Sequence, residues 1–186
     1  MLKRSWILLI LPILFCSCAR KSPLRMSPVG ASVMNITVTS SAFTQGGSIP
    51  SKYTCGGQNI SPPLEWTAPP AKTMSYALIA DDPDAPRGTF THWVVYNIPN
   101  TQTTLSESVP PSQSLQNGAL HGRNDFGRSG YGGPCPPSGT HRYRFKVYAL
   151  DTVLSLKAGA SASELERAMD GHLLAQGELM GKYSRK

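Results

Sequence analysis

Three polar clusters, each beside rigid turn residues, contain the side chains that could do chemistry in this sequence. They are residues 81–86 (DDPDAP), the pair His92-Trp93, and the loop 127–143, which ends in His141 and Tyr143. Carboxylates and imidazoles are the usual proton donors and acceptors of binding and catalytic sites. Whether these groups act together depends on the elements that carry them.

The acidic cluster has three carboxylates within four positions, those of Asp81, Asp82 and Asp84. Such close charges repel one another, so they need donors nearby or one must take up a proton. The two X-Pro steps make this turn stiff and extended. Alternatively, it is a solvated turn whose aspartates cap their own backbone.

The two histidines beside the other clusters fall on predicted strands. By alternation His92 lies on one face with three apolar residues, Val94, Tyr96 and Ile98, which is typical of a core histidine. A partner carboxylate would change that interpretation by fixing its tautomer. His141 shares a face with Tyr143 and Phe145. The glycines before His141 can expose backbone N–H groups to an anion. A purely structural hairpin loop is the alternative, although loops of this length are usually functional.

Cys55 and Cys135 are the only cysteines after the N-terminal segment, and they are separated by 80 positions. In an exported protein such a pair is a candidate disulfide, which would stabilise the fold by about 4 kcal/mol. Two buried thiols are the alternative. The body has no CxxC or close His/Cys spacing, and we expect no metal site and no cofactor.

The elements between these clusters are short and rich in turn residues, with 17 glycines and 16 prolines in 186 residues. That composition favours strands and ordered loops over a helical bundle. Strands are predicted over residues 35–40, 75–80, 91–98 and 142–150, and a helix is predicted from about Ser161 to Met169. A second short helix is expected over 172–182. The predicted fold is mainly β, an antiparallel β-sandwich with one or two C-terminal helices.

The N-terminal residues have the pattern of an export signal. Lys3 and Arg4 precede a short apolar run over residues 6–15, which is too short for a membrane span. A small residue then precedes Cys18, as in a bacterial lipoprotein signal. We therefore predict a signal peptide over 1–18 lipidated at Cys18, a flexible tether over 19–33 and a domain over 34–186, anchored to a bacterial membrane, with the outer membrane favoured. An ordinary cleaved signal and an uncleaved anchor remain alternatives.

The net charge of +7 does not indicate nucleic-acid binding. Five of the 18 Lys and Arg residues precede residue 31, whereas all 11 Asp and Glu residues follow it. The body is therefore close to neutral, and a basic face for nucleic acid is not supported.

Taken together, the motifs resemble the phosphatidylethanolamine-binding (Raf kinase inhibitor-like) family, and its bacterial branch most. The resemblance covers about residues 35 to 183. Its motifs are DPDAP at 82–86, HW at 92–93, GYGGPCPP at 130–137 and HRY at 141–143, with further likeness at 60–66, 124–127 and 171–179.

The resemblance implies a β-sandwich with a small surface pocket that accepts a phosphate-like or carboxylate anion, such as a phospholipid headgroup. The ligand-binding positions that it implies are Asp82, Asp84, His92, Cys135, Pro136, Pro137, His141 and Tyr143. Asp82 would hydrogen-bond an imidazole and keep it cationic beside the anion. Cys135 stands where animal members have glycine, and the loop before His141 is two residues shorter. Members of the family include inhibitors of kinases and proteases, so an unnamed protein partner is expected.

Three functions follow as hypotheses. The favoured one is a membrane-anchored binding or regulatory module without turnover. The second is a weak phosphoester or acyl hydrolase that uses His92 and His141 as acid and base. The third is a structural envelope lipoprotein. No nucleophile elbow is visible, and a disulfide would disarm Cys135 as a nucleophile.

Overall fold

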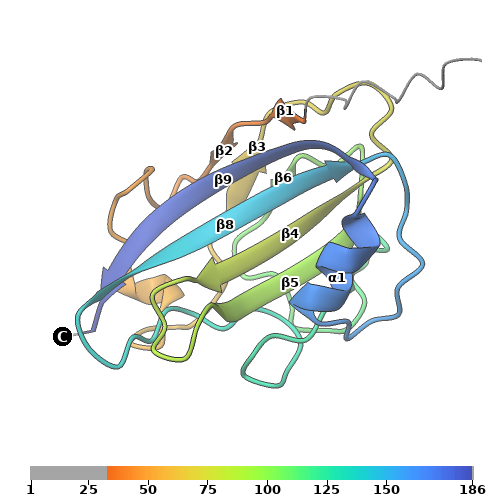
Figure 1. Cartoon of the computed structure of the whole chain (residues 1–186). Helices are drawn as coiled ribbons and strands as arrows, with labels where there is room; N and C mark the ends of the chain where they lie inside the picture. Colours follow the sequence, from red (N-terminus) through yellow and green to blue (C-terminus); the bar gives the residue numbers. More distant parts are fainter. Residues whose placement is uncertain (1–32, 186) are drawn as a thin grey trace, which may run out of the picture. The chain divides into compact units, whose positions relative to one another are not determined.

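The computed structural model describes residues 33–185. The predicted signal peptide with its Cys18, and the predicted tether up to residue 32, lie outside the described residues. In the described part the chain forms two sheets, one of six strands in the order β1-β9-β8-β4-β5-β7 and one of three strands in the order β2-β3-β6 (Figure 1). The mainly β prediction is confirmed.

The strands of the large sheet are β1 (Met34–Asn35), β4 (Ser75–Asp82), β5 (Phe90–Pro99), β7 (Leu120–His121), β8 (Thr140–Leu150) and β9 (Leu173–Ser184). Those of the small sheet are β2 (Val38–Thr39), β3 (Leu64–Trp66) and β6 (Thr104–Leu105). The helical elements are a 3₁₀ turn, η1 (Ser51–Tyr53), and one α-helix, α1 (Ala162–Met169).

Strand β4 forms the centre of the large sheet. All eight of its residues are buried, and it pairs antiparallel with β5 on one side and β8 on the other. Its run of small and apolar residues fits this place, because a strand covered on both faces needs apolar side chains on both. The acidic cluster begins at the end of β4, so the sheet itself positions the first carboxylates.

Two layers of apolar side chains cover the two faces of the large sheet. Between the sheets lie large side chains that include Trp66, Trp93, Tyr143 and Phe145. On the other face Ile79 and Val94 pack against Leu165 of α1. The helix starts at Ser161 with a capping box to Glu164, as expected for that serine.

The second helix predicted over 172–182 is wrong, because those residues form strand β9. Leu, Ala, Gln, Glu and Met favour helix by propensity, but β9 pairs with almost the whole of β8. On the other edge of β9, Gly177 permits a close approach of the segment that follows β1: a Cβ there would lie 2.0 Å from the carbonyl oxygen of Ile36. Tertiary pairing therefore outweighs local propensity.

The strand predicted over 35–40 is divided between the two sheets. Met34 and Asn35 pair in parallel with β9, whereas Val38 and Thr39 pair with β3. The chain thus crosses from one sheet to the other within a few residues.

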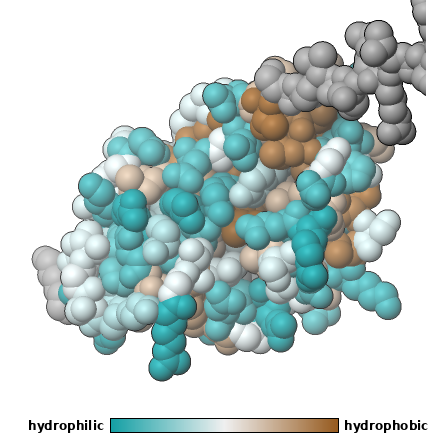
Figure 2. All heavy atoms as spheres, viewed as in Figure 1, coloured by the Kyte–Doolittle hydropathy of each residue, from teal (hydrophilic) through white to brown (hydrophobic). Residues whose placement is uncertain are grey.

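The surface is largely polar in the view of Figure 2, with an apolar patch near β1. Met34, on β1, is 55% exposed, and Met74, which precedes β4, is 53% exposed. Within residues 33–185, no helix has the length and apolar character needed to cross a bilayer.

Candidate functional site

A β-bulge at the start of β5 determines where His92 points. The register changes from Ala80 opposite Trp93 to Asp81 opposite Thr91, so His92 is an extra residue on β5. Such a bulge re-aims the side chain that it carries. The prediction that His92 shares a face with Val94 and Tyr96 is therefore wrong, because those two lie on the helix side of the sheet, whereas Ile98 packs between the sheets.

The bulge brings His92 to the two residues that β8 supplies. The ring centroid of Tyr143 lies 5.2 Å from that of His92 and 6.5 Å from that of His141. Nδ1 of His141 lies 2.7 Å from Oδ2 of Asp82. All four residues are buried. We call this cluster of Asp82, His92, His141 and Tyr143 the imidazole site.

Each carboxylate of the acidic cluster has its own partner on β8. Asp81 accepts from Nε of Arg144 at 2.8 Å and lies 2.6 Å from Nζ of Lys146, on the helix side of the sheet. Asp82 faces the other side and meets His141. The repulsion expected from the sequence is thus relieved by donors that β8 presents on both of its faces.

Asp84 extends the imidazole site to its rim. It pairs with Arg142, whose Nη2 lies 2.6 Å from Oδ1, and these hydrogen bonds lower the pKa of Asp84 to about 2. Its backbone N–H donates to Oδ1 of Asp82 at 2.8 Å. The aspartates therefore also cap their own turn, as the alternative interpretation proposed.

His92 is held as a neutral imidazole. Its Nδ1 lies 2.6 Å from the carbonyl oxygen of Gly132, which can only accept, so Nδ1 carries the proton. Burial lowers the pKa of His92, with smaller opposing effects from Gly132 and nearby carboxylates. The free Nε2 of a neutral ring is an acceptor, so near pH 7 His92 accepts a hydrogen bond rather than donating one to an anion.

His141 is held in the same way, but by a carboxylate instead of a carbonyl. Its Nδ1–H donates a hydrogen bond to Asp82, which leaves Nε2 as the ring nitrogen that can face a ligand. The His141 side chain is 10% exposed, against 5% for Asp82, so it is the side through which solvent reaches the pair.

Tyr143 lies between the two imidazoles, and its hydroxyl is buried with no hydrogen-bond partner among the described residues. Burial raises the pKa of this phenol well above its usual value, and the charge of Asp82 raises it further. Asp82 and the backbone N–H of Cys135 lie near enough to affect that pKa, but neither makes a well-formed hydrogen bond to the hydroxyl. A buried donor of this kind is uncommon and marks a place for a ligand or water.

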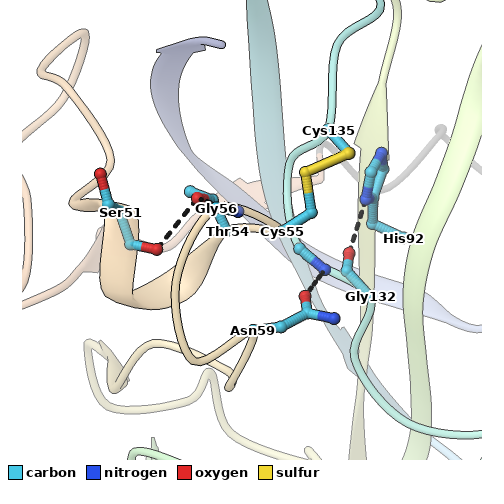
Figure 3. Close-up of a disulfide and its surroundings, with 9 residues drawn as sticks. Ser51, Thr54, Cys55, Gly56, Asn59, His92, Gly132 and Cys135 are labelled. Atoms are coloured by element: carbon cyan, nitrogen blue, oxygen red, sulfur yellow. Dashed lines mark hydrogen bonds between the residues drawn. A yellow bond between two sulfur atoms is a disulfide. The ribbon is translucent and has the colours of Figure 1, made fainter. Parts of the chain in front are cut away.

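The predicted disulfide is confirmed: Cys55 and Cys135 are bonded, with their Cα atoms 5.4 Å apart (Figure 3). Beside it, the backbone N–H of Cys55 donates to the carbonyl oxygen of Pro134 at 3.1 Å. Pro136 is buried, whereas Pro137 is exposed. The bond fixes this proline-rich loop, which the sequence resemblance assigned to the site, against the η1 segment.

Two glycine N–H groups of the loop are used within the protein. Gly132 donates to the carbonyl oxygen of His92 at 3.0 Å, and Gly133 donates to Oδ1 of Asn59 at 2.7 Å. These two groups are therefore not available to an anion. Their role is to hold the loop and His92 together.

Two aromatic residues that the sequence did not assign to the site flank His92. Phe90 and Phe126 lie edge-on to the imidazole, with centroids 5.2 and 5.4 Å away. Phe126 is 43% exposed and is presented by a turn that the buried Asn124 pins through its side-chain oxygen. The NDFG motif was the available signal, because an Asx turn followed by an aromatic residue places that ring at a loop tip.

Among the described residues no group of three or more His, Cys, Asp or Glu side chains is arranged to hold a metal ion. Cys135 is oxidised in the disulfide, so it offers no thiolate nucleophile in this state.

Comparisons with known proteins agree with this fold. The family model described as phosphatidylethanolamine-binding protein matches residues 39–184. The UPF0098 protein of Methanothermobacter thermautotrophicus is 55% identical over 144 residues, which cover 77% of this chain and 95% of the relative. The UPF0098 protein of Aquifex aeolicus is 48% identical over 164 residues, which cover 87% of this chain and 94% of the relative.

Two solved structures are similar in fold and sequence. A putative phosphatidylethanolamine-binding protein homologue from Chlamydia trachomatis has a TM-score of 0.76 and 42% identity, covering 82% of this chain and 99% of that one. An E. coli structure described as a new member of the mammalian family has the same TM-score and coverage at 35% identity. The fold, the family model and these relatives show that the chain belongs to the phosphatidylethanolamine-binding protein family.

Proposed function

We propose that the protein is a binding module that holds a small oxyanion, of phosphate or carboxylate type, at the imidazole site. Phosphatidylethanolamine, which the family description names, carries one such group in its phosphodiester. The anion would accept from Nε2 of a protonated His141 and from the hydroxyl of Tyr143. Hydrogen bonds to charged donors are the strongest that a site of this size can offer.

The observation that carries this proposal is the unpartnered, buried hydroxyl of Tyr143 between two imidazoles. Leaving such a donor without a partner costs about 1–3 kcal/mol, which a bound acceptor would recover. Asp82 is already committed to Nδ1 of His141 and to the backbone of Asp84, so it supports the imidazole instead of repelling the ligand. The neutral His92 can accept from a protonated oxygen or an ammonium group of the same ligand.

The proposal includes export and lipid anchoring through Cys18, which would keep the domain at a membrane where phospholipid headgroups are abundant. Two or more acyl chains give durable attachment, whereas one chain gives only marginal binding. Treatment of cells with an inhibitor of lipoprotein signal cleavage, followed by mass spectrometry of the N-terminal peptide, tests this part by itself.

The anion site is tested by calorimetric titration with sulfate, whose charge is constant across the pH range used. We expect the affinity to fall as the pH rises from about 5 to 8, since imidazoles lose their protons over this range. His141→Gln should weaken sulfate binding by about tenfold, the worth of roughly one charged hydrogen bond.

His172→Gln is the matched control. His172 pairs with Asp151 at 2.8 Å, as His141 pairs with Asp82, but both side chains of the control pair are more than 40% exposed. Sulfate affinity that is independent of pH, or equal losses in the two variants, would contradict the proposal. Turnover of phosphoesters by the parent and not by His141→Gln would favour the hydrolase alternative.

A further inference from the structure

A cavity lies at the end of the β8–β9 pair where β8 begins and β9 ends. It is next to the imidazole site, because its lining residue Tyr183 pairs with His141, but the two share no residue. It has a volume of about 610 Å³, within the usual range for small-molecule pockets. Its walls come from the segment before η1, from the turn after it, and from the ends of the two strands. The lining residues are Ser48, Ile49, Ser51, Gly56, Thr140, Lys182, Tyr183, Ser184 and Arg185.

All the charged side chains in this lining are positive. Lys182 and Arg185 supply two cations, and no aspartate or glutamate is among the lining residues. Neither cation makes an ion pair with any residue of the described part of the chain. Elsewhere on this domain, Arg142, Arg144 and Lys146 each have a carboxylate partner, whereas exposed lysines such as Lys72 and Lys157 have none among the described residues.

Five hydroxyl groups complete the lining, those of Ser48, Ser51, Thr140, Tyr183 and Ser184. Within residues 33–185 none of these side-chain hydroxyls is committed to a hydrogen bond with another residue. Hydroxyls can donate to an oxyanion, and they can turn to do so. The hydroxyls offer hydrogen-bond donors, and Lys182 and Arg185 offer positive charges, which are the groups that an anion site needs.

The walls are held in place by backbone hydrogen bonds. Ile49 donates to the carbonyl oxygen of Lys182, and Lys182 donates to that of Gly47, both at 2.8 Å. The disulfide beside Gly56 joins the other wall to the loop of the imidazole site (Figure 3). Gly56 also keeps the cavity open, because a Cβ there would lie 2.9 Å from the hydroxyl of Tyr183.

From these observations we propose that this cavity binds the phosphate of a phosphomonoester. Two cations match a dianion, and the phosphate monoester group carries close to two charges at pH 7. A phosphoethanolamine diester headgroup fits less well, because no carboxylate in the lining can accept its ammonium group. The site is separate from the imidazole site and does not depend on the function proposed there.

The test is a titration of the ¹⁵N-labelled domain with glycerol phosphate, followed by NMR. We expect backbone amide signals of residues 48–56 and 182–185 to shift together. The double variant Lys182→Gln/Arg185→Gln should weaken this binding by about a hundredfold, roughly tenfold for each charged hydrogen bond removed. Glycerophosphoethanolamine serves as the zwitterionic probe and should bind more weakly than glycerol phosphate.

The matched control is Lys72→Gln/Lys157→Gln, which removes the same charge from two exposed lysines outside the cavity. Equal weakening in the control, or shifts confined to the imidazole site in the parent, would overturn the proposal. His141→Gln separates the two sites by affinity. The His141 side chain is not part of the cavity lining, so the dissociation constant of the cavity should stay unchanged, although the amide signal of its cross-strand neighbour Tyr183 can shift. If sulfate does not bind at the imidazole site, the proposal for the cavity still stands. If glycerol phosphate does not bind at the cavity, the proposal for the imidazole site still stands.

Discussion

Reduction of the Cys55–Cys135 disulfide should lower the free energy of unfolding by about 4.5 kcal/mol. The two cysteines are 80 positions apart, and in the chain-entropy model a loop of this length costs the unfolded chain about 15 cal/mol/K when it is closed. At 25 °C that entropy corresponds to the value given. This loss is a large part of the free energy of unfolding of a folded domain, which is about 5–15 kcal/mol.

The folded state should survive reduction, because hydrogen bonds join the same two segments. Tyr131 donates to the carbonyl oxygen of Tyr53 at 2.8 Å, and Gly133 donates to Asn59 at 2.7 Å. The effect should therefore appear in the unfolded state, and the slope of free energy against urea concentration should rise as the unfolded chain expands.

The assay is urea denaturation followed by tryptophan fluorescence, with and without a thiol reductant. The Cys55→Ala/Cys135→Ala variant is the control: it should match the reduced parent and should not respond to the reductant. A change of less than about 1 kcal/mol on reduction would refute the reasoning, since the chain-entropy estimate would then be wrong by more than its usual error.

Two further predictions concern stability. Burial lowers the pKa values of both His92 and His121, so below about pH 6.5 the unfolded chain binds more protons than the folded one. The free energy of unfolding should therefore fall as the pH drops, by up to about 1.4 kcal/mol per pH unit for each histidine. Urea midpoints that stay constant from about pH 7 to 5 would contradict this. Gly177→Ala should cost about 3 kcal/mol, because its Cβ would lie 2.0 Å from backbone, whereas Gly181→Ala should cost about 1 kcal/mol, because it meets side chains that can move. Equal thermal unfolding midpoints for the two glycine variants would exclude that difference.

The sequence predicted the strands of the site well because their patterns are strong. The strand over 142–150 alternates cleanly, and it places His141, Tyr143 and Phe145 on one face, as observed. The apolar run over 75–80 is the central strand β4. The disulfide was predicted from the single cysteine pair in the body together with the expectation of export.

Two features could not be read from local patterns. The bulge at His92 is set by the pairing of β5 with β4, and alternation cannot reveal an extra residue in one strand. Strand β9 consists largely of residues that favour helix, and only its pairing with β8 makes it a strand. Gly177 and Gly181 were the signals against a helix there, since glycine weakens a helix interior.

The charge state of His92 also departs from expectation. The resemblance implied that Asp82 would keep an imidazole cationic beside the anion. The contact with the carbonyl oxygen of Gly132 and the burial of the ring make His92 a neutral acceptor instead. The site therefore combines one imidazole that is hydrogen-bonded to a carboxylate with one that is suited to accept, and the second favours a ligand that has a proton to give.

The most direct test of the account follows the ring nitrogens of the histidines by NMR during titration with phosphate near pH 6. The account predicts that Nε2 of His141 and Nε2 of His92 shift together with one dissociation constant, while those of His121 and His172 do not move. Shifts at His172 equal to those at His141, or no shift at His141 and His92 at saturating phosphate, would contradict it.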